Sequence, residues 1–233
     1  MTDRITSLDV LRGVAVMGIL LMNIIALSMP EPAYMSPVAF GDGSAVDIAG
    51  WAVMFVLVDG KMRGFFTILF GASTLIVWQR AQEAGGDGAS VHLKRMVWLL
   101  VFGFLHFFLI WTGDILTLYA LCGMVALFLV QKDVDQLWGN AIALFAVHFI
   151  IFSGMCAVFY AMQHFAMMPG ATADSVQDFR DIVDGIQGTP DSLAKDVALY
   201  QSGWLTIVRD TLSKDAFNPI AQFLTFGVEA LGL

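Results

Sequence analysis

The sequence has few charged residues, only six prolines and only two cysteines. Asp, Glu, Lys and Arg make up 14% of its 233 residues, against about a quarter in an average soluble domain. Hydrophobic residues make up 58%, which excludes a disordered chain and an ordinary soluble enzyme. Cys122 and Cys156 lie in apolar runs without metal-ligand spacing. We therefore exclude a disulfide scaffold and expect two buried free thiols.

Basic residues are also scarce. Twelve Lys and Arg face twenty Asp and Glu, giving a net charge of −8. This balance excludes a nucleic-acid partner, because phosphate binding needs a basic surface. The sequence also lacks a glycine-rich phosphate loop, a zinc-ligand cluster and a Gly-x-Ser-x-Gly motif. We expect neither a bound cofactor nor a metal.

Long apolar runs dominate the sequence. A membrane span needs about 20 apolar residues, and the runs predict an all-α fold, a polytopic transmembrane helical bundle of five spans plus a partial sixth. The predicted spans cover residues 8–29, 62–80, 96–111, 115–130 and 137–168, and the partial span covers 216–233.

Three regions follow from this division. Residues 1–168 form a transmembrane core, and residues 169–215 form a polar extracytoplasmic segment with one or two surface helices. Residues 216–233 begin a truncated helix, so we expect the natural chain to continue. Residues 30–50 read as a loop, followed by an interfacial or re-entrant helix up to about Val58, with a single straight span over 51–78 as the alternative. Residues 79–95 read as a polar connection.

Lys and Arg flank alternate connections. They occur before the first span and in the second and fourth connections, whereas the loop 30–50 and the third connection contain none. The long segment 169–214 also carries four, but long loops weigh little in assigning topology. The positive-inside rule then places the N-terminus in the cytoplasm. The chain is expected to be a multi-pass protein of the bacterial inner membrane, and its first partner is the lipid bilayer.

Ionisable groups inside spans cost about 2.5–3.5 kcal/mol each on insertion scales, so they are functional candidates. Arg12 and Asn23 are eleven residues apart, close to three helical turns. They share one face at levels roughly 16 Å apart. An interfacial anchor and an interhelical hydrogen bond are the alternative interpretation.

His106 is a candidate general base, because Asp114 follows eight residues later at the outer turn. A carboxylate can fix the tautomer of a histidine, as general-base chemistry requires. A packing role for His106 is the alternative. Lys94 and Arg95 lie at the cytoplasmic start of the same span.

Asp59, Lys61 and Arg63 form a third polar group at the start of the second span. They are candidate substrate-binding residues at the depth of Asn23 and His106. An interfacial charge cluster with an Asp59–Arg63 pair is the alternative, since residues four apart on a helix are neighbours.

Three ordered sequence blocks resemble those of the YeiB-like inner-membrane proteins. They are SLDVLRGVA at 7–15, followed by Met22-Asn23; KMRGFFTILFGA at 61–72; and GFLH at 103–106 with WTGDILTLYA at 111–120. The resemblance implies a C-terminal membrane domain of unknown function beginning about where this sequence stops.

The same family is similar to a broader set of transmembrane acyltransferases, including the lysosomal heparan-glucosaminide N-acetyltransferase. Their Asp-x-x-Arg-Gly opening is matched by Asp9, Arg12 and Gly13. In the bacterial glycan enzymes of this set, a histidine occupies the place of Asn23. That departure leaves His106 as the base for acyl transfer in this chain.

The resemblance therefore implies transfer of an acyl group from cytoplasmic acyl-CoA, as co-substrate, to an extracytoplasmic glycan, lipid or small-molecule acceptor. His106 is the base, Asp114 orients it, and Asn23 donates to the developing oxyanion. Arg12, Lys94 and Arg95 pair with CoA phosphates. The alternatives are a transporter of a small anionic or amphipathic solute, or a non-catalytic truncated remnant. The oligomeric state stays open.

Overall fold

The computed structural model describes residues 6–40 and 43–232, and these residues form helices and turns without a strand. The predicted all-α fold is confirmed. The helices are α1 Thr6–Ser28, α2 Pro32–Met35, α3 Ala45–Leu57, α4 Lys61–Glu83, α5 Gly88–Leu109, α6 Leu116–Ala126, α7 Val134–Met167, α8 Ala173–Gln187, α9 Pro190–Gln201, α10 Trp204–Lys214 and α11 Asn218–Gly232.

Among the described residues, three helices are long and apolar enough to cross a membrane: α1, α5 and α7. They identify the chain as a membrane protein. Helix α4 has 23 residues but is more polar, and α6 has only 11 residues, about 16 Å of helix. The count of five spans stays a prediction.

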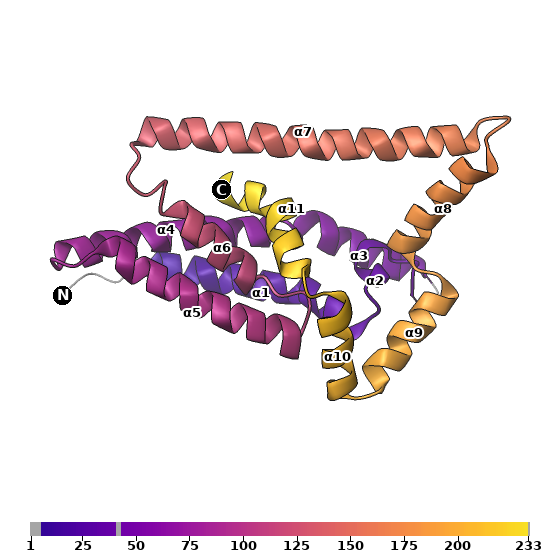
Figure 1. Ribbon diagram of the computed structural model, residues 1–233, viewed down its shortest axis with the longest axis horizontal. Coiled ribbons are helices and arrows are strands. Elements are labelled where there is room, and N and C mark those ends of the chain that lie inside the picture. The colour runs from indigo at the N-terminus through magenta and orange to yellow at the C-terminus, as the bar shows by residue number, and fades with distance from the viewer. Residues whose placement is uncertain (1–5, 41–42, 233) are drawn as a thin grey trace.

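Helices α1, α4, α5 and α6 form a bundle, and α7 lies apart from it along one side (Figure 1). Helix α1 packs on α4, α4 packs on α5, and α5 packs on α6, while α11 contacts both α6 and α7. Small residues allow the close approach of α1 and α4, because Gly18 lies directly against the Met62 side chain. Helix α7 is otherwise covered with exposed apolar side chains, as expected of a surface that faces lipid.

The connections alternate between the two ends of the bundle (Figure 1). The α4–α5 turn and the α6–α7 connection lie at the end where α1 begins, and the α5–α6 turn lies at the other end. The two short connections that the sequence marks with Lys and Arg therefore lie at one end, whereas the long segment α8 to α10, which carries Arg180, Lys195, Arg209 and Lys214, lies at the other end. This arrangement agrees with the predicted alternation, and the cytoplasmic placement of that end stays a prediction.

Several predicted boundaries were wrong because local capping was overlooked. The expected loop at 30–50 contains α2 and the start of α3, where the Ser44 hydroxyl accepts a hydrogen bond from the Asp47 N–H. The polar stretch 79–95 is helical except for a short turn that contains Gly85 at positive φ. Charged residues there lengthen the helices beyond their apolar runs.

The polar segment 169–215 contains three helices, α8 to α10, rather than the one or two predicted. Thr189 caps α9 through a reciprocal capping box with Ser192, and Gly203 at positive φ separates α9 from α10. The thiol prediction was half wrong: Cys122 is buried on α6, but Cys156 is exposed on α7.

Candidate functional site

The α5–α6 hairpin brings His106 and Asp114 together. His106 Nδ1 lies 2.9 Å from Asp114 Oδ1, and the Asp114 side chain is fully buried. The second carboxylate oxygen accepts a hydrogen bond from the Thr117 N–H at 2.9 Å. Asp114 therefore binds the first turn of α6, where unpaired helix N–H groups favour a carboxylate, and faces α5 with its other oxygen.

His106 keeps 34% of its side chain accessible beside that buried carboxylate. The close contact lies off the N–H axis, since neither Nδ1 nor Oδ1 makes a hydrogen bond of normal geometry among the described residues. A carboxylate at this position favours a proton on Nδ1 and leaves Nε2 free to accept one. The arrangement can therefore supply a general base at the edge of the bundle.

Packing and hydrogen bonds around the turn hold the hairpin in place. The Trp111 ring lies against Gly113, and Trp204 of α10 donates from Nε1 to the Leu109 carbonyl at 2.6 Å. Gln222 of α11 donates to the Thr112 carbonyl at 3.4 Å. Sequence patterns did not indicate the last two contacts, which join segments about 100 residues apart.

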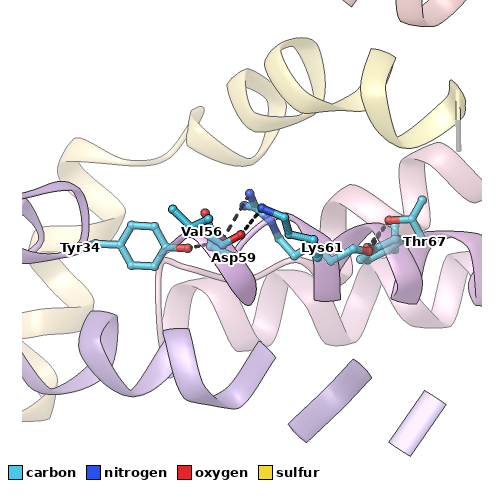
Figure 2. Close-up of polar contacts among 7 residues, drawn as sticks. Tyr34, Val56, Asp59, Lys61 and Thr67 are labelled. Carbon is cyan, nitrogen blue, oxygen red and sulfur yellow. Dashed lines mark hydrogen bonds and ion pairs between the residues drawn. The ribbon is translucent and has the colours of Figure 1, made fainter. Parts of the chain in front are cut away.

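A second polar cluster lies where α3 meets α4 (Figure 2). The Tyr34 hydroxyl donates to Asp59 Oδ1 at 2.7 Å, and Arg63 Nη2 lies 3.6 Å from the same oxygen. The Asp59–Arg63 pair of the charge-cluster interpretation is present, and the substrate-binding role of these residues stays a prediction. The Lys61 ammonium donates to the Val56 carbonyl, and the Trp51 indole donates to the Tyr34 carbonyl at 3.0 Å.

This cluster continues into the bundle through the backbone of α4. The carbonyl of Arg63 accepts from the Thr67 hydroxyl at 2.9 Å, and that hydroxyl lies 2.7 Å from the Tyr119 hydroxyl of α6. The chain of contacts thus leads from Tyr34 on α2 to Tyr119 on the buried face of α6, and Figure 2 shows its part from Tyr34 to Thr67. Sequence patterns indicated Asp59 and Arg63 but missed Tyr34 and Tyr119, because no regular spacing connects them.

Replacing Tyr34 with Phe is expected to destabilise the protein by about 1 kcal/mol, less than a fully buried hydrogen bond to a charged group because the site is partly exposed. Burial, with help from the Asp59 hydrogen bond, raises the pKa of Tyr34 above its ordinary value of 10. The folded protein holds this proton more tightly, so the stabilisation is complete below pH 10 and shrinks as the pH rises further.

Thermal melting of the wild type and Tyr34→Phe at pH 8 and about pH 11 tests this expectation. The difference in melting temperature should be smaller at the higher pH. A difference that grows with pH would contradict the assigned hydrogen bond, because the raised pKa keeps Tyr34 protonated in the folded protein while tyrosine ionises in the unfolded chain, and this can only reduce the stabilisation.

The other predicted site residues are not gathered at the His106–Asp114 pair. Arg12 Nη2 donates to the Ser73 hydroxyl at 2.5 Å and joins α1 to α4. Lys94 and Arg95 are exposed near the start of α5. Asn23 is half-buried on α1, a helix that packs mainly on α4 rather than on the α5–α6 hairpin.

No group of three or more His, Cys, Asp or Glu side chains that could hold a metal ion occurs in the described part of the chain. Within the described residues, two places bring the predicted polar side chains into contact. One is the His106–Asp114 pair, and the other is the cluster around Asp59.

The sequence is similar to bacterial proteins described as uncharacterized. It is 36% identical to YxaH of Bacillus subtilis over 155 residues, which are 64% of this chain and 38% of that protein. It is 34% identical to YeiB of Escherichia coli over 147 residues, 62% of this chain and 36% of that protein. A 39.9 kDa protein from the amylase 3′ region of Bacillus acidopullulyticus is 35% identical over 146 residues, 61% of this chain and 39% of that protein.

These similarities support a relationship of this chain to a YeiB-like family. The matched stretch spans less than two fifths of each curated relative. No family model and no solved structure matches the chain. None of these comparisons shows a link to acyltransferases.

Proposed function

We propose that the chain belongs to a membrane protein that transfers an acyl group from cytoplasmic acyl-CoA to an extracytoplasmic acceptor. The observation that carries this proposal is the close contact between partly accessible His106 and fully buried Asp114. An ionised carboxylate inside an apolar bundle is costly, and its placement against a histidine suits general-base chemistry. In this proposal the chain lies in the bacterial inner membrane with its N-terminus in the cytoplasm.

The reaction joins a hydroxyl group of the acceptor to the acyl carbon of the thioester. His106 Nε2 accepts the hydroxyl proton as the oxygen attacks the carbonyl carbon and forms a tetrahedral oxyanion. The carbon–sulfur bond then breaks, and the thiolate of CoA takes the proton from His106. The products are an acylated acceptor and CoA thiol, and no oxidant or metal is required.

The cations at the opposite end of α5 would bind the donor. Arg95 is eleven residues before His106, roughly 16 Å along the helix axis, and this interval separates the nucleotide phosphates from the thioester. Lys94 and Arg95 are exposed and can pair with those phosphates. Asn23 is the proposed oxyanion donor, which requires α1 and the hairpin to approach each other around the bound substrate.

Radiolabelled acyl-CoA supplied to the cytoplasmic face of membrane vesicles tests the proposal. The vesicles carry the full-length protein, its His106→Ala variant or the matched control His148→Ala, whose histidine lies on α7 outside the hairpin. Labelled acceptor should form with the wild type and the control and be lost with His106→Ala. Equal labelling by all three, or none by any, would refute the transfer chemistry assigned to His106.

A further inference from the structure

A cavity of about 320 Å³ lies between α4, α6, α7 and α11. Its lining is largely apolar and includes Phe70, Leu75, Cys122, Leu137 and Leu231. The volume lies within the usual range of small-molecule sites. Neither His106 nor Asp114 lines it, so the cavity is separate from the proposed site of acyl transfer.

One polar group in the lining has no partner. The Thr67 and Tyr119 hydroxyls bind each other at 2.7 Å. The Asn140 Nδ2 atom, by contrast, is buried without a hydrogen-bond partner among the described residues. An unpaired amide donor costs free energy in a dry site, so an occupant with a carbonyl oxygen is favoured over a purely hydrocarbon one.

We propose that this cavity binds a single acyl chain whose carbonyl oxygen accepts a hydrogen bond from Asn140 Nδ2. At the roughly 30 Å³ that a water-sized group occupies, the volume suits a chain of about ten carbons. A phospholipid ester and an acyl-CoA thioester share this chemistry. The proposal goes beyond the proposed function, because it concerns a second site and holds whether or not transfer occurs.

Gly71 offers a way to close the cavity. It lines the cavity, and a Cβ added there meets nothing within 4 Å. A Gly71→Leu side chain therefore fills the space without a clash at its base. Gly154→Leu is the matched control, because Gly154 lies on α7, has the same free surroundings and does not line the cavity.

The test uses the full-length protein in phosphatidylcholine nanodiscs and three probes with the same terminal diazirine. They are a decanoyl-CoA, a phosphatidylglycerol with that decanoyl chain, and a decyl hydrocarbon without a carbonyl. Photolysis should cross-link the carbonyl probes to the lining of the cavity, in the peptides that contain Leu75, Cys122 or Leu231. Comparison of the first two probes distinguishes a thioester source from a lipid source.

Gly71→Leu should reduce cavity labelling at least tenfold, while Gly154→Leu labels like the wild type. Asn140→Leu should weaken labelling by the carbonyl probes about five- to tenfold, the effect of one hydrogen bond, and leave the hydrocarbon probe unchanged. Labelling that is confined to the outer surface of α7, or that is equal in Gly71→Leu and Gly154→Leu, would overturn the proposal. If the wild-type protein shows this cavity labelling but does not transfer an acyl group, only the proposed function is refuted.

Discussion

Replacing His106 with Gln is expected to lower the rate of acyl transfer by about 10³-fold, within the usual contribution of general-base catalysis. Asp114→Asn is expected to lower it by a similar factor, and the double variant should be no slower than either single one. Residues that act as one unit show such non-additive effects. Two independent contributions would instead multiply to about 10⁶-fold.

The geometry explains why His106→Gln and Asp114→Asn should lower the rate of acyl transfer by a similar factor. Asp114 touches His106 with one oxygen and holds the α6 N-terminus with the other. Asn can still accept the Thr117 N–H hydrogen bond through its amide oxygen, but it has no negative charge to hold the proton on Nδ1. The histidine then loses the partner that fixes its tautomer.

Transfer rates of the four proteins, with His148→Gln as control, check this prediction at equal amounts of folded protein in vesicles. The control should keep the wild-type rate, since His148 stacks on Phe152 of α7 away from the hairpin. A double variant that is slower than both single variants by a further 10²-fold or more would contradict a shared role of the two residues.

The sequence predicted the residue pairs that are close along the chain. The span of α5 and the short turn after it place Asp114 next to His106, and helical spacing places Asp59 next to Arg63. Long apolar runs also predicted α1 and α7 closely, because such runs with polar flanks leave one interpretation.

Contacts between distant segments could not be predicted in this way. Tyr34 reaches Asp59 from a short helix inside an expected loop, and Trp204 reaches the α5–α6 turn from an expected surface segment. These contacts depend on packing angles and loop paths, which leave no periodic signal. The cavity beside Asn140 is formed by four helices, and for the same reason it could not be predicted from the sequence.

Gly103 controls how closely the hairpin that holds the His106–Asp114 pair can pack. A Cβ at Gly103 would lie 2.6 Å from both the backbone nitrogen and the hydroxyl oxygen of Thr117. The nitrogen belongs to the α6 backbone, so a rotamer change cannot relieve the clash. Helices α5 and α6 would have to separate, and Asp114 would lose its position at the start of α6.

Gly103→Ala is therefore expected to destabilise the protein by about 2–3 kcal/mol, the upper part of the usual range for overpacking. Gly154→Ala on α7, where an added Cβ meets nothing within 4 Å, should be neutral or stabilising by up to about 1 kcal/mol, since Ala favours helix over Gly. Thermal melting of both variants measures the difference. Adding Thr117→Ala to Gly103→Ala should restore only part of the loss, because the backbone nitrogen remains in the way. Full recovery would show that the hydroxyl alone sets the spacing and that the two helices do not touch through their backbones.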